Sequence, residues 1–372
     1  MQPGTDVLYN LLGLDKFELD TPCLTIDLDI LESNIGLMAD FMKERGKEWR
    51  PHQKCHKTPA IAWKQIEAGA HGITVAKVSE AEVFASAGIR NILIANMIVG
   101  RPKLEKLAIL CRDNNIIVGC DHYVQAEMLS EVCVKHGVTC GMLVEVDIGL
   151  NRVGVRPGRD TVDLARGIDQ LPGVKLEGIM GYEGHLLLIE DAEEKQSKIN
   201  ESVGMLRHCQ ELMRKEGLCC DIVSAGGTGS YQITTDLDWV TELQAGGGIF
   251  ADPFYQQRCG VKGLGYALTV IASVVSRPSL GKAVLDSGRK TINPDICLPV
   301  PKDYADAKVV RMSAEHCELE LGPKSQELRI GDKVELIVGY ADFTTPLHDN
   351  FIACRKGKVE AIFPIHGRGK IQ

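Results

Sequence analysis

The chain has 372 residues, of which 44% are hydrophobic and 25% are charged, and its formal net charge is −8. This balance is typical of a globular protein long enough for two domains. The negative charge argues against nucleic acid or an anionic membrane as a partner, because both need a basic surface.

The sequence predicts neither a membrane span nor a secretory signal. No apolar run reaches the roughly 20 residues that span a bilayer, and the first residues, MQPGTDVLYNLLGLDKFELD, lack the basic start and apolar core of a signal peptide. The 13 cysteines include no Cys-x-x-Cys pair. We therefore expect reduced thiols, no membrane partner and a location in the cytoplasm.

Helical patterns alternate with short apolar runs along the first two thirds of the chain. Residues 27–46, DLDILESNIGLMADFMKERG, carry apolar residues at helical spacing and stop at Gly46. Residues 79–88, SEAEVFASAG, open with Ser79 and Glu82, the spacing of a capping box. Eight apolar runs of strand length lie between such helices, at 48–54, 72–76, 91–96, 116–121, 141–147, 175–184, 220–227 and 241–248.

This alternation predicts parallel βα units, and eight of them favour a (β/α)8 barrel over a doubly wound open sheet. After residue 260 the apolar runs lie close together with turn residues between them. That pattern predicts an antiparallel β-domain. The expected division is a barrel at residues 28–258 and a β-domain at residues 1–27 plus 259–372.

In such a barrel the chemistry gathers where the strands end. Polar residues follow the fifth and sixth predicted strands: Asp147, Asn151, Arg152, Tyr182, Glu183 and His185. Among these, His185 is the candidate for proton transfer, because its intrinsic pKa lies near the operating pH. A purely structural role is the alternative for this histidine.

Two glycine clusters follow the seventh and eighth predicted strands, in SAGGTGSY (224–231) and QAGGG (244–248). Backbone N–H groups approach an anion closely where no Cβ intrudes, so two such clusters side by side favour a phosphate site over ordinary tight turns. Ser224 and Thr228 offer hydroxyl groups to the same anion, and Gly226, Gly227, Gly246 and Gly247 offer N–H groups.

The segment WRPHQKCHKTP (49–59) concentrates cations. Along an extended strand Arg50, His52 and Lys54 share one face, which would point into the barrel. Inward cations need an anion, and a phosphorylated cofactor would supply one. A lysine beside a phosphate site indicates a Schiff base with pyridoxal 5'-phosphate, with a structural ion pair as the alternative for Lys54. Lys57 is expected to be solvated at the rim.

The sequence resembles the fold-type III pyridoxal-phosphate enzymes related to alanine racemase, and most of all their D-threonine aldolase / D-serine dehydratase group. The resemblance runs nearly end to end. It rests on the motifs TPCLTIDLDILESNI, RPHQKCHKTP, KVSEAE, NRVGV, SAGGTGSY, ELQAGGG and KVEAIFPIHGRGK.

The resemblance implies that Lys54 carries the cofactor, that Arg152 faces the pyridoxal 3'-oxygen and that Tyr182 lies beside the ring. It implies that Gly226, Gly227, Thr228 and Gly246 hold the phosphate. It also implies a homodimer in which the partner's β-domain completes the active site.

One departure from the family concerns a divalent metal, which members bind through a histidine and, two residues on, a cysteine or aspartate. Here the corresponding segment reads GYADFTTPLHD, with Tyr340 in the place of the histidine and Asp342 as the remaining ligand. Tyrosine is a poor ligand unless ionised, and one carboxylate seldom holds a catalytic metal. His348 and Asp349 lie nearby and could substitute, but the resemblance makes them a separate landmark and not the ligands. The sequence therefore disfavours a tightly bound divalent metal without excluding one.

The resemblance implies a lyase acting on small D-amino acids that bear a β-hydroxyl group, by retro-aldol cleavage to glycine and an aldehyde. Dehydration is the first alternative, and a site poor in metal disfavours it because hydroxide is the worse leaving group. A racemase, with Tyr340 of the partner as second base, and a non-catalytic cofactor carrier that lacks a β-domain are further alternatives. If Tyr340 acts in the reaction, it does so as a hydrogen-bond donor or, with a lowered pKa, as a base.

Overall fold

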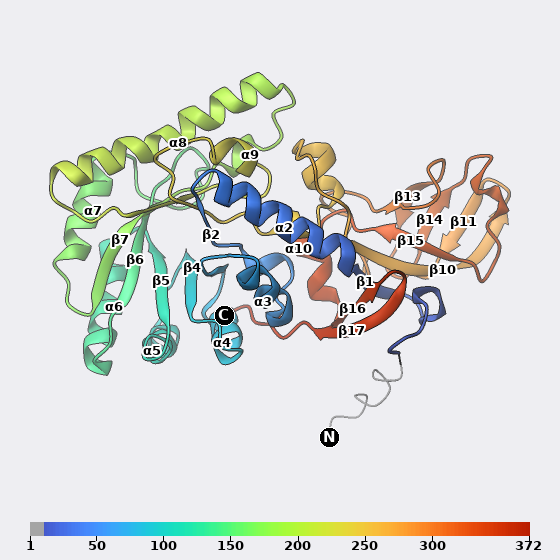
Figure 1. The fold of residues 1–372 in the computed structure, drawn as a ribbon, viewed down its shortest axis with the longest axis horizontal. Coiled ribbons are helices and arrows are strands. Elements are labelled where there is room, and N and C mark those ends of the chain that lie inside the picture. Colours follow the sequence, from blue (N-terminus) through green and yellow to red (C-terminus); the bar gives the residue numbers. More distant parts are fainter. Residues whose placement is uncertain (1–10) are drawn as a thin grey trace.

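The structure is a computed structural model that describes residues 11–372, and it contains two sheets (Figure 1). Eight strands form a parallel sheet in the order β2-β9-β8-β7-β6-β5-β4-β3. Their bounds are β2 Glu48–Trp49, β3 Ile73–Val75, β4 Asn91–Met97, β5 Asn115–Cys120, β6 Cys140–Glu145, β7 Val174–Met180, β8 Ile222–Ala225 and β9 Glu242–Leu243.

Backbone hydrogen bonds next to β2 and β3 bring the two ends of this sheet together. The N–H of His71 donates to the carbonyl of Trp49 (2.8 Å), and the N–H of Thr74 donates to the carbonyl of Pro51 (2.9 Å). His52 and Thr74 form an isolated parallel bridge. The predicted (β/α)8 barrel is thereby confirmed, and the open doubly wound sheet is wrong.

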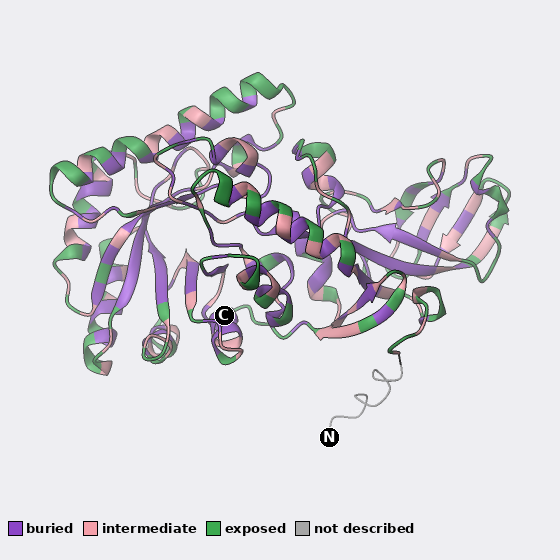
Figure 2. Ribbon diagram, in the orientation of Figure 1, coloured by how far each residue is buried: buried purple, intermediate pink, exposed green. Residues whose placement is uncertain are grey.

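Helices cover the outside of the barrel, and Figure 2 shows buried residues along the strands and exposed ones on the outer faces of the helices. Leu28–Glu44 (α2) matches the helix predicted over 27–46, and the Asp27 carboxylate caps it by accepting from the Ile30 N–H. The others are α3 Pro59–Glu67, α4 Val78–Ser86, α5 Arg101–Leu110, α6 Tyr123–His136, α7 Arg159–Asp169, α8 Ala192–Lys215 and α9 Tyr231–Thr234.

The capping box predicted from Ser79 and Glu82 is wrong. Helix α4 begins one residue earlier, at Val78, and the carboxylate of Glu80 accepts from the N–H groups of Ala76 and Lys77. Ser79 is buried and lies one residue inside the helix. The Ser-x-x-Glu spacing occurs by chance in a segment rich in small and acidic residues.

The first barrel strand is much shorter than the predicted 48–54. Only Glu48–Trp49 is assigned to the strand, and Gln53–Cys55 forms a 3-10 turn, so Arg50 and Lys54 do not share a strand face. Arg50 is fully buried and pairs with Glu242, with its Nε 2.9 Å from Oε2, and also donates to Asn91. Asn91 and Glu242 begin their strands, so the anion that compensates Arg50 lies at the opposite end of the barrel from the predicted phosphate site.

The second sheet is antiparallel except for the parallel pair β1–β16, and β1 inserts between β10 and β16. Its strands are β1 Cys23–Asp27, β10 Leu268–Ser279, β11 Lys282–Leu285, β12 Val300–Pro301, β13 Lys308–Met312, β14 Cys317–Glu320, β15 Lys333–Ile337, β16 Asn350–Arg355 and β17 Lys358–Pro364. The domain boundaries at 28 and 258 stay a prediction, and residues 1–10 of the predicted β-domain lie outside the described part of the chain.

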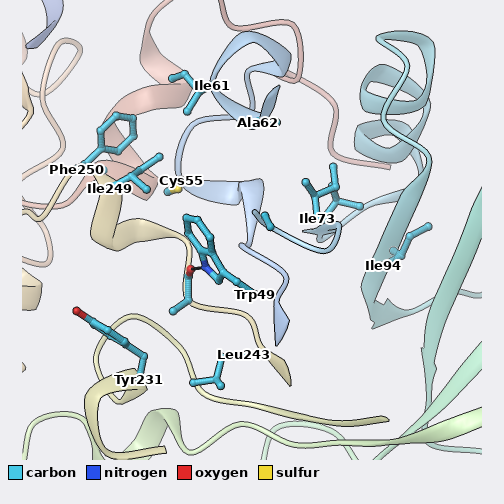
Figure 3. Close-up of a cluster of buried hydrophobic side chains, with 14 of the residues drawn as sticks. Trp49, Cys55, Ile61, Ala62, Ile73, Ile94, Tyr231, Leu243, Ile249 and Phe250 are labelled. Atoms are coloured by element: carbon cyan, nitrogen blue, oxygen red, sulfur yellow. Dashed lines mark hydrogen bonds between the residues drawn. The ribbon is translucent and has the colours of Figure 1, made fainter. Parts of the chain in front are cut away.

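A continuous buried core joins the barrel to its helices. Figure 3 shows part of it, with the indole of Trp49 among Ile73, Leu243 and Ile249. The Trp49 indole N–H donates to the carbonyl of Ala245 (2.8 Å), so this large residue is both packed and hydrogen-bonded. Among residues 11–372, the structure contains no helix whose length and apolarity would let it cross a membrane.

The buried Arg50–Glu242 pair allows a test of this architecture. Arg50→Met should lower the free energy of unfolding by about 3–5 kcal/mol, because it leaves the Glu242 carboxylate buried without its partner. The double variant Arg50→Met/Glu242→Leu should recover most of that loss. Chemical denaturation measures both. Lys198→Met, which removes an exposed pair with Glu201, is the control and should cost at most about 1 kcal/mol. Equal losses for Arg50→Met and Lys198→Met would contradict the assignment.

Candidate functional site

A cavity of about 350 Å³ opens where the barrel strands end, as predicted. Nine of the predicted site residues line it: His52, Lys54, Arg152, Tyr182, Gly226, Gly227, Thr228, Gly246 and Gly247. They come from loops after five different strands, far apart in the sequence, so barrel closure brings them to one cavity.

Lys54 reaches this cavity from the 3-10 turn after β2. Its amine lies 3.5 Å from Oδ2 of Asp342, which belongs to the short helix α10 (Ala341–Thr344) of the second sheet's domain. The side chain of Lys54 is 45% exposed, so a molecule that enters the cavity can reach it. Lys57 is not the solvated rim residue that the sequence predicts, because it forms a largely buried ion pair with Glu80.

The two glycine clusters lie against each other at the cavity. The Gly247 N–H donates to the hydroxyl of Thr228 (2.9 Å), which ties the loop after β9 to the loop after β8. A Cβ on Gly246 would lie 2.1 Å from the carbonyl oxygen of His52, and one on Gly227 would lie 2.8 Å from the ring of Tyr182. Only glycine fits at Gly246 against the backbone of His52, and a side chain at Gly227 would need the ring of Tyr182 to move.

Buried side chains fix the first glycine loop. The Glu183 carboxylate accepts from the Gly226 N–H (3.3 Å) and from the Thr234 hydroxyl (2.6 Å), and Gly226 has a φ of +76°, which favours glycine. Ser224 is the exception among the predicted cofactor residues. It does not line the cavity, and its hydroxyl accepts from the side chain of Gln244. Its contribution is to orient Gln244, which does line the cavity.

Arg152 and Glu145 lie on the β6 side of the cavity. Glu145 is almost fully buried, and burial raises its pKa to about 7 although the nearby Arg152 acts in the opposite direction. Burial and the neighbouring Lys54 lower the pKa of His52 well below its usual value, so this imidazole is neutral near pH 7. Its Nδ1 accepts from the Lys54 N–H (3.3 Å), which shapes the turn that carries the lysine.

Tyr340 and Asp342 do not line the cavity, but each contacts a residue of the same chain that does. The ring of Tyr340 packs against Tyr255, which lines the cavity, with the centroids 6.0 Å apart. Burial and the Asp342 carboxylate raise the pKa of Tyr340, so the base role that required a lowered pKa is wrong for this arrangement. The hydroxyl stays protonated and can donate a hydrogen bond.

A buried aspartate connects the barrel to this part of the second sheet's domain. The Asp252 carboxylate accepts from the N–H of Ala341 (2.9 Å) and from the N–H of Tyr255 (3.1 Å). Burial raises the pKa of Asp252 to about 8 in spite of these two hydrogen bonds. Because Ala341 lies between Tyr340 and Asp342, Asp252 fixes where both side chains point.

His185 is the predicted catalytic residue that the structure does not bring to the cavity. It is exposed and lies against Gly149, where a Cβ would come within 2.9 Å of its Nε2. Several cavity residues were not predicted from the sequence, including Asn96, Glu145, Gln244 and Tyr255. Gln244 opens the second glycine cluster, which was a usable signal, whereas Glu145 and Tyr255 have no flanking motif.

The cavity fits a phosphorylated cofactor. The N–H groups of Thr228 and Gly246 are buried, and within residues 11–372 neither donates a hydrogen bond. Unpaired buried donors are costly unless an anion accepts from them. Lys54, at the opposite loop, supplies the primary amine that a pyridoxal aldehyde needs.

The same region does not fit a divalent metal. Asp342 pairs with Lys54, and Tyr340 packs among three aromatic rings. His348 bonds to the carbonyl of Thr291, and Asp349 pairs with Arg368, so neither substitute ligand is free. In the part of the chain that the structure describes, no group of three or more His, Cys, Asp or Glu residues could hold a metal ion.

Comparisons with known proteins agree with this arrangement. The family model described as alanine racemase, N-terminal domain, matches residues 26–252, and the model described as putative serine dehydratase domain matches residues 267–354. The 3-hydroxy-D-aspartate aldolase of Paracoccus denitrificans (strain Pd 1222) is 34% identical and the alignment covers 99% of this chain and 97% of the relative. The D-threonine aldolase of Arthrobacter sp. is 33% identical over 94% of this chain and 93% of the relative.

A solved structure of D-threonine aldolase from Filomicrobium marinum superposes with a TM-score of 0.94 at 37% identity, covering 97% of this chain and 98% of the other. The expected fold is therefore that of the alanine racemase-like enzymes, which implies pyridoxal 5'-phosphate as the cofactor. The chain belongs to the alanine racemase-like family, and two of its relatives there, at 33–34% identity over nearly the full length, are named as aldolases.

Proposed function

We propose that this chain is a pyridoxal-phosphate lyase that cleaves the Cα–Cβ bond of small D-β-hydroxy-α-amino acids to give glycine and an aldehyde. The observation that carries the proposal is the meeting of Lys54, the paired glycine loops and Asp342 at one cavity. The two aldolases at 33–34% identity over nearly full length support the same reaction.

The chain's residues divide the task between them. When bound, pyridoxal phosphate accepts the electron pair that the broken Cα–Cβ bond leaves on Cα. Lys54 would hold the cofactor through a covalent bond from its amine, and that amine would become free to act as a base or acid once the substrate's amino group takes its place. The N–H groups of Thr228 and Gly246, which have no acceptor within residues 11–372, would hold the phosphate, and Arg152 would contact the 3'-oxygen. The N–H groups of Gly226 and Gly247 already donate to Glu183 and Thr228 and keep the two loops in place.

Asp342 is our candidate for the base that accepts the β-hydroxyl proton as the carbon–carbon bond breaks and the aldehyde carbonyl forms. Its Oδ1 is buried without a hydrogen-bond partner, while Oδ2 faces the Lys54 amine. Lys54 then returns a proton to Cα, which completes glycine. The raised pKa keeps the Tyr340 hydroxyl protonated. In this scheme that hydroxyl donates a hydrogen bond to the β-oxygen of the substrate. His185 is left without a role in this scheme.

Dehydration stays the second candidate, because the model that matches residues 267–354 is described as a serine dehydratase domain. Loss of hydroxide needs Lewis-acid or proton assistance, and the donors near Asp342 do not fit a metal. A racemase needs a base on the opposite face of the substrate, and Tyr340 packs in its own chain with a raised pKa. A cofactor carrier without a β-domain does not match a chain with a nine-stranded second sheet.

The proposal also covers the oligomeric state of the protein and its location in the cell. We infer a homodimer from the family, and the half-exposed apolar side chain of Val153 at the cavity supports a partner surface there. All 13 cysteines are free, which supports a reducing compartment such as the cytoplasm.

Product analysis tests the reaction. The protein loaded with cofactor is incubated with D-threonine, D-serine and D-alanine. We expect acetaldehyde and glycine in equal amounts from D-threonine. Ketoacid with ammonia as the main products would indicate a dehydratase, and formation of the enantiomer would indicate a racemase. No product from any of the three would reject the proposal.

The cofactor lysine can be identified directly. Lys54→Ala should abolish the visible absorption band of the covalently bound cofactor, and borohydride reduction of the wild type followed by peptide mapping should label Lys54. Lys57→Ala is the control and should keep the band, although it should be less stable because Glu80 loses its partner. A reduced adduct on Lys57 would contradict the assignment.

Gly227→Val should lower cofactor affinity sharply, because the new Cβ would collide with the ring of Tyr182 at 2.8 Å. The left-handed φ occurs at Gly226 and not at Gly227, so the effect comes from this collision and not from backbone strain. Spectral titration with pyridoxal phosphate measures it. Gly204→Val in α8, where a Cβ meets open space, is the matched control. Unchanged affinity in Gly227→Val would place the phosphate elsewhere.

The reaction should not depend on a metal. Activity should survive prolonged chelation, and Tyr340→Phe should lower kcat by about 100-fold, a loss typical of one donor that stabilises developing charge. Packing should change little, since only one oxygen is removed. Elemental analysis that finds about one divalent ion per chain, together with chelator-sensitive activity and a near-normal Tyr340→Phe variant, would contradict this account.

A further inference from the structure

One residue of the cavity wall has no role in the proposed function. Glu145 is the last residue of β6, and within residues 11–372 it is the one lining residue that carries a carboxyl group. Its side chain is almost fully buried, and no described residue donates a hydrogen bond to it. Burying a carboxyl group without a partner is costly, so an unpartnered one at a cavity indicates a functional role.

Two other carboxylates lie near Glu145, and both already have partners. Asp121, which follows β5, accepts from the N–H of Gly154 (3.0 Å). Asp147, which follows β6, accepts from two N–H groups of its own loop, both at 3.0 Å. These bonds shape the loop that carries Arg152. The carboxyl group of Glu145 is therefore the acidic group on this side of the cavity that is left to pair with a cation.

The loop that carries Arg152 folds back onto the end of β6. The N–H of Val155 donates to the carbonyl of Glu145 (3.0 Å), and Val155 also forms an isolated parallel bridge with Val146. The backbone of the loop is thus fixed relative to Glu145. The side chain of Arg152 is exposed, and it forms no ion pair with any residue that the structure describes. Its backbone is held, whereas its guanidinium group is not.

Glu145 and Arg152 attract each other while water still fills the cavity. Arg152 lowers the pKa of Glu145, but burial raises it and nearby Asp121 adds to that effect, so the pKa lies at about 7. A bound cofactor displaces water from the cavity, and the attraction between opposite charges becomes stronger as the dielectric constant falls. A guanidinium group has five N–H donors, enough for a carboxylate and a cofactor oxygen at once.

We infer that Glu145 positions Arg152. When the cofactor binds, the carboxyl group of Glu145 releases its proton to solvent and accepts from the guanidinium group, which is then held against the cofactor's 3'-oxygen. The inference rests on the proposed function, in which Arg152 contacts that oxygen. Glu145 is a positioning residue in this account, because it acts through Arg152 and does not touch the cofactor.

Cofactor affinity gives the first test. Glu145→Gln keeps the size of the side chain and removes its charge, so spectral titration at about pH 8 should give a Kd for pyridoxal phosphate at least about tenfold above that of the wild type. Glu131→Gln, on the exposed face of α6, is the matched control and should leave the Kd unchanged. An unchanged Kd in Glu145→Gln would overturn this inference alone. A wild type that does not bind the cofactor would reject the proposed function and the inference together.

A double-mutant cycle shows whether Glu145 acts through Arg152. Arg152→Met should weaken cofactor binding by itself. In that background, Glu145→Gln should change the Kd by less than about twofold, because the group that it positions is gone. A tenfold effect that persists in the Arg152→Met background would contradict the inference, since Glu145 would then act on the cofactor by another route.

The pH dependence of binding has a defined sign. The titratable or charged groups that act on Glu145 or line the same cavity are Arg152, Asp121, Asp147, Lys54, His52 and Tyr182. Because binding lowers a Glu145 pKa that starts at about 7, it releases a proton below that pH and none well above it. The titrations of the cofactor and of the other groups are common to wild type and Glu145→Gln.

The ratio of the two Kd values therefore isolates Glu145. The advantage of the wild type over Glu145→Gln should stay constant above about pH 8 and should shrink several-fold between about pH 7 and about pH 6. A ratio that does not change with pH would contradict the release of a proton from Glu145.

Folding stability separates positioning from a structural role. At about pH 8 the folded protein without cofactor carries a buried carboxylate whose pKa is raised above its unfolded value, and this lowers stability. Glu145→Gln should therefore have an unchanged or higher midpoint of chemical denaturation although it binds the cofactor less tightly. A lower midpoint together with weaker binding would show that Glu145 supports the fold, and it would overturn the inference.

Discussion

The segment from Trp49 to Cys55 joins every part of this molecule that bears on the site. Its backbone accepts from the loop before β3 at Trp49 and from β3 at Pro51, and its N–H groups at Arg50 and His52 donate to the carbonyls of Leu243 and Gln244. The segment therefore closes the barrel on both sides. Because Lys54 lies in the turn at the end of this segment, the hydrogen bonds that close the barrel also position the Lys54 amine.

The same segment contacts the domain that contains the second sheet. The Thr345 hydroxyl donates to the carbonyl of Cys55 (2.8 Å), and Asp342 faces Lys54. Asp252, from the barrel, holds the N–H of Ala341 between Tyr340 and Asp342. Two hydrogen bonds thus fix the geometry of α10 relative to the barrel. Backbone and carboxylate groups of this chain therefore define the placement of Tyr340 and Asp342.

The sequence predicted the barrel, the β-rich second part and most of the site because these depend on local patterns. Alternating strands and helices are readable from periodicity, and glycine clusters after strands mark close backbone approach whatever else surrounds them. The role of Lys54 as the cofactor lysine stays a prediction, but the local geometry expected for it was wrong. The strand was expected to continue to residue 54, whereas the 3-10 turn at Gln53–Cys55 turns Lys54 toward the cavity.

What the sequence could not predict depends on distant contacts. The ion-pair partner of Arg50 is Glu242, nearly two hundred residues away, and no sequence motif around either residue indicates that they pair. The sequence predicted a solvated Lys57, because it gives no sign that Glu80 lies beside this residue in the fold. Tyr340 could act as a base only if its pKa were lowered. Burial and the Asp342 carboxylate raise this pKa instead, and the residues that bury Tyr340 come from distant parts of the chain. The proton-transfer role of His185 stays a prediction, since the residue is exposed and is not among those that line the cavity.

The central claim is that the loops after β8 and β9 hold the phosphate of a cofactor bound to Lys54. A crystal structure of the cofactor-loaded protein after borohydride reduction tests it most directly. We predict continuous density from Nζ of Lys54 to the pyridine ring, with the phosphate oxygens within hydrogen-bond distance of the N–H groups of Thr228 and Gly246. Phosphate density against any other loop, or a cofactor attached to a different lysine, would contradict the account.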